Sequence, residues 1–430
     1  MAEQPPAVAR AAAIAADIPA SELPRLRRRM RWVLFAVAAL GSTGYIAAVT
    51  VGTLVAADLS GGAALGGLPT TTTTIGTATA ASLIALIMLR WGRRLGLLLG
   101  LAVGVLGGGV VLLSVIAGSI PLLLIGSALT GFANAAGNLG RYIAADMAAP
   151  ERRASAIGLV VWGTTVGAVI GPNLTAPAGA AAVSLGLPEL AGPYRLTVLF
   201  IGLAWVVAAV LLRPEPYALA DPSALPTLDQ HGQVPSLPAI LSRPSVATAL
   251  VTLVAAQVVM VLIMTMTPLH LIDHGHGLAT VGLVLSAHTF GMFGLSPITG
   301  GLTDRFGSPL VIAAGLIGLA LAALLAALAP PDGGFLLTIA LFLLGYGWNL
   351  CFVAASSLVS HGLSLAERTR VQGIADALTW GTAAFASLSS GLVVAYGSYT
   401  VLGFVGVALT VIPAVFLALQ RRRVWPSGTA

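Results

Sequence analysis

Two pairs of sulfur and imidazole side chains recur at helical spacing in the second half of the sequence. Met260 and Met264 form one pair, and His288 and Met292 form the other. A spacing of i, i+4 places both members of each pair on one face of a helix, one turn apart. Thioether sulfur and imidazole nitrogen are neutral donors that suit Cu(I), and neither motif contains the carboxylates that Mg²⁺ or Ca²⁺ prefer. The pattern therefore indicates copper as the ligand.

The elements that hold these side chains must be membrane helices, because the chain is too apolar for a soluble protein. Of its 430 residues, 57% are hydrophobic and 8% are charged, and the mean hydropathy is +0.96. A bilayer core requires about 20 apolar residues per helix. The sequence predicts an all-α integral membrane fold with about twelve such helices in two six-helix halves. The predicted helices lie at 32–57, 69–89, 95–117, 120–145, 155–177, 194–212, 245–270, 278–300, 309–329, 335–360, 371–395 and 400–420.

The arginines predict how these helices are oriented. All 21 basic residues are arginine, and most of them fall on alternate connections between the predicted helices. The positive-inside rule assigns that side to the cytoplasm, which places both termini there. Topology alone explains the net charge of +6, so nucleic acid is not a predicted partner. The predicted location is a cytoplasmic membrane, crossed many times, with the lipid bilayer as a partner.

An internal repeat divides the helices into two halves. The second predicted helix is followed at 90–94 by Arg-Trp-Gly-Arg-Arg. The eighth is followed, about 215 residues later, by Gly-Gly-Leu-Thr-Asp-Arg-Phe-Gly. A proline-rich segment breaks the helical pattern between the halves and is predicted to be their cytoplasmic linker. The predicted parts are a cytoplasmic tail at 1–31, with residues 1–24 disordered, a first half at 32–212, the linker at 213–243, a second half at 244–420 and a cytoplasmic tail at 421–430.

Residue types that are scarce or missing exclude several classes of protein. Cys351 is the single cysteine, so neither an intramolecular disulfide nor a dithiol metal site can form, and any reduction of Cu(II) must happen elsewhere. The sequence has no lysine, and therefore no phosphate-binding loop of the G-x-x-x-x-G-K-[ST] type. Direct use of ATP is excluded, and no catalytic set of Ser, His and Asp is evident. The chain is predicted to be neither an enzyme nor a cofactor-binding protein.

The repeated loops resemble a motif of the major facilitator superfamily, G-x-x-x-D-R-x-G-R, and the resemblance covers essentially the whole chain. The second half matches from Gly300 to Gly307 but has Ser308 as its last residue, and in the first half Ala85 and Leu89 replace the Gly and the Asp. In the family, the acidic residue and its neighbouring Arg latch the cytoplasmic side in one state. An alternative is that the arginines only anchor the loops to headgroups. The gating residues that the resemblance implies are Arg90, Arg94, Asp304, Arg305 and Gly307.

Two further features lie within the predicted fourth and fifth helices. Gly163, Gly167 and Gly171-Pro172 resemble a G-x-x-x-G-x-x-x-G-P motif of proton-coupled drug exporters, and small residues one turn apart equally favour tight helix packing. Asn134 and Asn138 share one face of the fourth helix. Amides at membrane depth face a cavity or another helix, so these two are predicted either to line a substrate path or to bond between helices.

Within the superfamily, the placement and interval of the two soft-ligand motifs resemble the CcoA-like copper importers of bacteria, which supply copper for cytochrome oxidase assembly. The resemblance implies that Met260, Met264, His288 and Met292 bind copper. Related members of that group carry riboflavin instead. Met is also an ordinary packing residue, and a buried His288 is alternatively satisfied by Thr289 or a backbone carbonyl.

Three histidines surround the predicted turn between the seventh and eighth helices. His270 and His274 share a face if the helix persists, so with His276 they are candidates for capturing a metal at the outer mouth. The alternative is a solvated, pH-sensing loop.

Together these features predict a secondary transporter that moves copper, as Cu(I) and inward, by alternating access. A monomer is expected, with protons as the coupling ion if one is needed. The rival prediction is a proton-coupled carrier of small organic molecules in which His288, Asp376 or Asp146 titrates.

Overall fold

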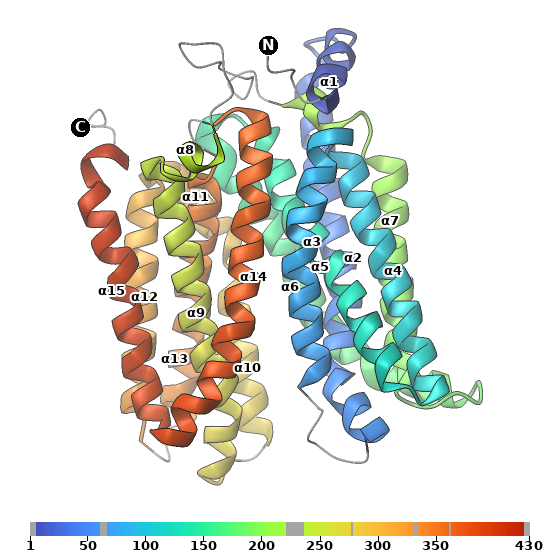
Figure 1. Cartoon of the computed structure of the whole chain (residues 1–430), viewed down its shortest axis with the longest axis vertical. Helices are drawn as coiled ribbons and strands as arrows, with labels where there is room; N and C mark the ends of the chain where they lie inside the picture. Colours follow the sequence, from blue (N-terminus) through green and yellow to red (C-terminus); the bar gives the residue numbers. More distant parts are fainter. Residues whose placement is uncertain are drawn as a thin grey trace. The chain divides into compact units, whose positions relative to one another are not determined.

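The computed structural model describes residues 6–60, 67–220, 236–276, 278–330, 334–360 and 363–424 (Figure 1). Within these ranges the regular structure is helical, as predicted for the fold class. The middle of the linker, at 221–235, and the last residues of the tail, at 425–430, lie outside the described residues. The helices of the first part are α1 (Pro6–Ala16), α2 (Leu23–Ser60), α3 (Leu68–Trp91), α4 (Arg93–Ala117), α5 (Ile120–Asp146), η2 (Pro150–Arg152), α6 (Arg153–Val183), α7 (Ala191–Leu211) and η3 (Pro216–Leu219). The remainder are α8 (Leu237–Leu241), α9 (Pro244–Asp273), α10 (Leu278–Phe293), α11 (Ser296–Phe306), α12 (Ser308–Leu328), α13 (Gly334–Leu358), α14 (Leu365–Tyr396) and α15 (Tyr399–Val424).

Twelve helical segments in the described residues are long and apolar enough to cross a membrane, which confirms the predicted number. One of them, Thr280–Phe306, joins α10 and α11. Another, α2, begins at Leu23, because the arginine-rich stretch continues the helix beyond the apolar residues. The predicted boundary between tail and first helix at 31/32 therefore lies inside α2.

The expectation of a disordered N-terminus fails for Pro6–Ala16, which forms helix α1. Alanine is the best helix former, and one side of α1 is covered: Ala7 and Ala11 are buried against Tyr217 and Leu365. The alanines of this segment thus favour helix α1, which packs against other residues, although the prolines had suggested a disordered tail.

The contacts group the residues into two compact units. Unit 1 comprises Met1–Ala149, Gly163–Thr227 and Leu363–Trp380, and unit 2 comprises Pro150–Trp162, Leu228–Gly362 and Gly381–Ala430. This grouping departs from the predicted halves, because the start of α14 belongs to unit 1 and the start of α6 to unit 2. In unit 1, α5 packs with α2, α3 and α4, and α7 packs with α2 and α4. In unit 2, α13 packs with α9, α10 and α12, and α15 packs with α9 and α12.

The glycines of the fifth predicted helix pack α6 against α2. A Cβ at Gly163 would lie 2.8 Å from the Phe35 carbonyl oxygen, and one at Gly171 would lie 3.1 Å from the Thr43 carbonyl oxygen. At Gly167 a Cβ would collide with Ser42. Small residues let two helix backbones approach closely, so the structure supports the packing interpretation of this motif.

The eighth predicted helix is broken, whereas the sequence predicted a continuous one. Residues 294–295 form a turn between α10 and α11. Backbone groups freed by such a break need other partners. Asn349 of α13 supplies one: its Nδ2 donates to the Met292 carbonyl oxygen at 2.6 Å and to Ser296 Oγ at 2.7 Å. The amide of a neighbouring helix therefore holds the two pieces together.

Candidate functional site

His288 lies in α10 and points toward α13. Its side chain is buried, and Nδ1 lies 2.9 Å from the Leu341 carbonyl oxygen. Because a carbonyl only accepts, Nδ1 carries the proton and Nε2 keeps its lone pair. Nε2 has no hydrogen-bond partner in the part of the chain that the structure describes. The alternative that a backbone carbonyl satisfies His288 is therefore correct for Nδ1. Nε2 remains a buried nitrogen with a lone pair that no described residue uses.

The predicted methionine ligands lie on α9 and α10. On α9, Gln257 accepts a hydrogen bond from Trp348 Nε1 of α13 at 2.8 Å. Met264 is seven residues from Gln257 and shares its helix face, and Met260 is buried nearby on the same helix. Met292 follows His288 by one turn on α10 and is half-buried. All four predicted ligands thus lie on two helices that pack against α13.

The predicted outer histidines form a stack rather than a cage. The His270 ring lies 4.3 Å from that of His274 and 4.1 Å from that of Tyr399 on α15. His274 Nδ1 is 2.7 Å from the His270 carbonyl oxygen, and His276 lies past the end of α9. Among the described residues, no group of three or more His, Cys, Asp or Glu is arranged to hold a metal.

A polar pocket of about 30 Å³ lies within unit 1. Five uncharged polar side chains line it, two from α2, two from α5 and one from α6. They are Ser42, Tyr45, Asn134, Asn138 and Thr164. A Cβ at Gly41 or Gly137, which also line the pocket, would meet nothing within 4 Å, so these glycines leave open space where other glycines serve packing.

The two asparagines of this pocket bond mainly to each other. Asn138 Nδ2 donates to the Asn134 carbonyl oxygen at 2.9 Å and to Asn134 Oδ1 at 3.3 Å. Asn134 Nδ2 makes a long bond of 3.4 Å to Thr77 Oγ1 on α3. The asparagines therefore line a cavity, and one of them bonds to a neighbouring helix, whereas a role in the substrate path stays a prediction.

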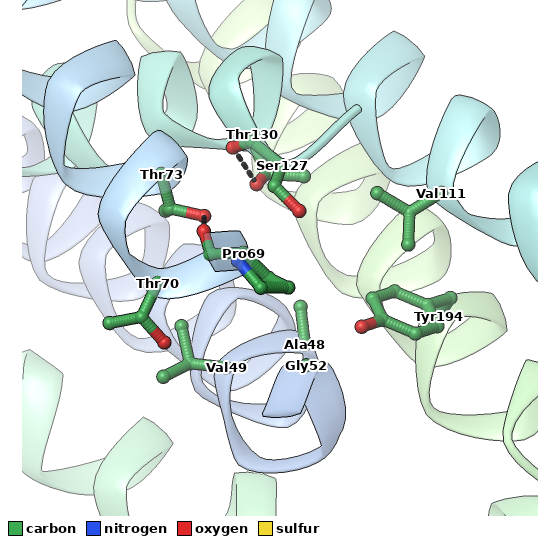
Figure 2. A pocket seen from close by; sticks show the side chains of 10 residues that line it. All are labelled: Ala48, Val49, Gly52, Pro69, Thr70, Thr73, Val111, Ser127, Thr130 and Tyr194. Atoms are coloured by element: carbon green, nitrogen blue, oxygen red, sulfur yellow. Dashed lines mark hydrogen bonds between the residues drawn. The ribbon is translucent and has the colours of Figure 1, made fainter. Parts of the chain in front are cut away.

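A second cavity in unit 1 is small. Its volume is about 10 Å³, and Figure 2 shows the Tyr194 hydroxyl turned toward the space among the threonines. Thr73 donates to the Pro69 carbonyl oxygen, and Thr130 donates to that of Ser127 (Figure 2). A space of this size holds about one water molecule. This cavity, beside the start of α3, is too small for a substrate.

The second-half loop places Asp304 at the start of α6. Its carboxylate accepts the backbone N–H groups of Ala154 at 3.0 Å and Ser155 at 2.9 Å. The first N–H groups of a helix lack partners within the helix, and the helix dipole favours an anion there. Arg305 instead lies over the Phe306 ring, and Gly307 has a φ of +83°, which favours glycine.

In the first-half loop the buried charge contact belongs to Arg93, which was not among the predicted gating residues. Arg93 Nη2 lies 2.6 Å from Asp146 Oδ2 and 2.6 Å from Gln372 Oε1. Arg90 lies over the Trp91 ring, and Arg94 donates to the Ala209 carbonyl oxygen. The sequence did contain a signal, because Arg93 occupies the last position of the loop motif.

A second buried ion pair lies nearby in unit 1. Arg141 Nη2 of α5 is 2.6 Å from Asp376 Oδ1 of α14, and Tyr142 Oη is 2.9 Å from the same nitrogen. Both carboxylates that the rival prediction singled out, Asp146 and Asp376, are thus paired with arginine. Charges at membrane depth are expected to pair in this way.

The sequence profile of the Major Facilitator Superfamily matches residues 32–379 and 272–429. The chain belongs to this superfamily. The riboflavin transporter RfnT of Brucella anthropi is 31% identical over 412 residues, which cover 94% of this chain and 98% of RfnT. YddS of Bacillus subtilis (strain 168), described as an uncharacterized MFS-type transporter, is 36% identical over 412 residues and 94% of each chain.

Solved structures of other transporters share the fold. The human organic anion transporter MFSD10 is 17% identical, has a TM-score of 0.70, and covers 91% of this chain and 99% of its own. The Escherichia coli fucose:proton symporter FucP is 16% identical with a TM-score of 0.67, over 92% of this chain and 98% of its own. The protein is therefore a multi-pass membrane transporter of the secondary type and not an enzyme, whereas the copper-importer resemblance stays a prediction.

Proposed function

We propose that this transporter carries a small organic molecule with uncharged hydrogen-bonding groups, and that riboflavin is the first compound to test. The observation that carries the proposal is the pocket of Ser42, Tyr45, Asn134, Asn138 and Thr164. Hydroxyl and amide groups both donate and accept hydrogen bonds, and no charged side chain lines this pocket. Such a site suits the polar edge of a neutral molecule better than a metal ion or an anion.

The size of the pocket limits what it can bind. A volume of about 30 Å³ is far below the several hundred Å³ of a typical ligand site. The pocket would therefore receive one polar edge of the molecule, with the remainder in the transport path. Full-length similarity to a riboflavin transporter supports this substrate class, because flavin rings present amide-like edges.

The test is uptake in a bacterial host that lacks its own riboflavin importer. Cell-associated riboflavin is measured by fluorescence and copper by mass spectrometry in the same cells. A change in riboflavin that requires this protein supports the proposal. Unchanged riboflavin together with changed copper would overturn it.

A matched pair of variants connects the result to the pocket. Gly137→Leu fills the open space that the glycine leaves and should lower riboflavin transport more than tenfold. Gly202→Leu on α7 adds the same side chain where a Cβ also meets nothing within 4 Å, but among the apolar side chains of an outer groove. Gly202→Leu should transport normally. Equal riboflavin transport by the two variants would show that this pocket does not bind the substrate.

Copper remains the second candidate because of one specific observation. The buried Nε2 of His288 has no hydrogen-bond partner among the described residues. Its helix, α10, also carries Met292, and Met260 and Met264 lie on α9, which contacts α10. Nitrogen and thioether donors suit Cu(I). His288→Ala and Met264→Ala should then abolish copper accumulation, whereas Met266→Ala, on a different face of α9, should not. Copper levels that match the parent in the first two variants would eliminate this candidate.

A further inference from the structure

The beginning of the linker is docked on unit 1. Pro216, Tyr217, Ala218 and Leu219 are all buried. Arg27 of α2 donates from Nε to the Leu219 carbonyl oxygen at 2.9 Å and from Nη2 to that of Ala220 at 3.1 Å. A connection that only joined two halves would not need buried side chains or these bonds. The segment Glu215–Leu219 therefore has a fixed position on unit 1.

Glu215 caps helix α4. Its carboxylate accepts the backbone N–H of Arg93 at 2.6 Å and that of Arg94 at 3.4 Å. No side chain within α4 caps this end. Gly92, just before the helix, has a φ of +110°, and a Cβ there would lie 2.8 Å from the Glu215 carboxyl. The helix start is thus shaped to receive a carboxylate from the linker.

Tyr217 connects Arg93 with α14. Its ring lies 5.4 Å from the Arg93 guanidinium carbon, a distance at which a cation is attracted to the ring face. Its hydroxyl lies 2.7 Å from Thr369 Oγ1 on α14. Burial raises the pKa of Tyr217 to about 12, so the hydroxyl keeps its proton for this bond. One linker side chain therefore contacts both Arg93 on α4 and Thr369 on α14, the two helices that the Arg93–Gln372 bond also joins.

Helix α1 covers the same segment. Ala7 and Ala11 pack against Tyr217 and Leu365, and Arg10 donates to the Arg90 carbonyl oxygen at the end of α3. The start of α14 is therefore enclosed by α1 and the linker segment together.

The first part of α14 is a segment that transport must move. Residues Leu363–Trp380 group with unit 1, whereas the same helix from Gly381 onward groups with unit 2. Alternating access moves one half of such a carrier against the other, so Thr369 and Gln372 must leave their unit 1 partners in one of the two states. We propose that the segment Glu215–Leu219 is a latch that holds the start of α14 on unit 1 and sets how readily the transporter changes state.

The test uses a cysteine reporter, which the chain makes simple because Cys351 is its single cysteine. In a Cys351→Ala background, Ser82→Cys on α3 places a thiol beside Gly373 of α14, since the Ser82 Cα would lie 3.6 Å from a Cβ at Gly373. Reaction with a small, membrane-permeant thiol reagent then reports departure of α14. Tyr217→Phe and Thr369→Val each remove one partner of the latch bond without removing its bulk.

Each single variant should raise the labelling rate about threefold to tenfold, the population shift expected from loss of one hydrogen bond. The double variant should label no faster than either single variant, because both remove the same bond. Tyr396→Phe, at an exposed tip of α14, should label like the parent. Folding of each variant is checked by size-exclusion chromatography in detergent, and Thr369→Val alone suffices if Tyr217→Phe does not fold.

Parental labelling rates in folded Tyr217→Phe and Thr369→Val would overturn the latch. Rates that multiply in the double variant would also overturn it, because the two side chains would then act separately. The measurement needs no substrate, so its outcome is independent of whether riboflavin, copper or another compound is carried.

Discussion

The two loops that the internal repeat relates use their charges in different ways. In the second-half loop, the motif's own carboxylate, Asp304, caps the start of α6. In the first-half loop Leu89 stands at that position, the cap of α4 comes from Glu215 in the linker, and Arg93 enters a buried ion pair. The two copies of the motif thus make different contacts, with helix capping in the second half and buried charge pairing in the first.

The starts of helices α14 and α6 are also capped in different ways. Where the first-half motif lacks its carboxylate, α14 caps itself: Glu367 Oε2 accepts the Ser364 N–H at 2.8 Å, and Ser364 Oγ accepts the Glu367 N–H at 3.4 Å. This reciprocal pair is a capping box. Helix α6 instead receives its cap from Asp304, about 150 residues away in sequence. The start of α14, where the first-half motif supplies no carboxylate, is thus capped by its own residues.

The largest expected effect concerns the buried ion pair of the first-half loop. Arg93→Met leaves Asp146 buried without its partner, which should cost about 3–5 kcal/mol and strongly lower the apparent melting temperature in detergent. Ser308→Ala, at the equivalent position of the other loop, should have little effect. Adding Asp146→Leu to Arg93→Met should restore much of the stability. Equal melting temperatures for Arg93→Met and Ser308→Ala would remove the distinction between the loops.

A medium effect is expected for the helix cap that Asp304 of the second-half loop supplies to α6. Asp304→Ala removes the acceptor for two N–H groups and should cost about 1–2 kcal/mol, with impaired transport. Asp304→Asn keeps one acceptor oxygen and should lie between Ala and the parent. Ser364→Ala should cost less than Asp304→Ala, because Glu367 still accepts the backbone N–H at position 364. Melting temperatures of the purified variants provide the comparison, and the reverse order would contradict it.

The smallest expected effect is a pH dependence at Glu215. Burial raises the pKa of this carboxyl above its ordinary value of 4.5, although the Arg93 backbone N–H works in the opposite direction. A carboxyl with a raised pKa in the folded state binds more protons folded than unfolded, so its contribution to stability decreases as the pH rises above 4.5. Glu215→Gln removes that contribution. The difference in melting temperature between parent and variant should therefore change with pH in that direction, and a constant difference would contradict the role of burial.

The membrane fold could be predicted from the sequence, because each span must satisfy its hydrogen bonds within one helix and be apolar over its length. The break at 294–295 could not, since the residue that compensates it, Asn349, lies on another helix. The docking of the linker could not be predicted either, because Glu215 and Arg93 are far apart in sequence and the proline-rich composition around Glu215 predicted only a cytoplasmic linker between the halves.

The candidate site was predicted in part. Helical spacing and apolar surroundings were sufficient to predict that His288 lies buried at membrane depth and that Asn134 and Asn138 share a face. The choice of Arg93 over Arg90 and Arg94 depends on which side chain reaches Asp146 on α5, and a single sequence carries no such distance. Whether the methionines of α9 and α10 meet around one ion is likewise a matter of tertiary packing.

The docked linker segment determines where this chain can be divided into separately expressed fragments. A cut at Leu212 would leave α4 without Glu215 and α14 without Tyr217, so the first fragment would lose both the cap and the contact. A cut after Ala220 keeps them. Even then the first fragment exposes the surface on which Leu363–Trp380 packs, so we expect it to be soluble in detergent only when the second fragment is produced in the same cell.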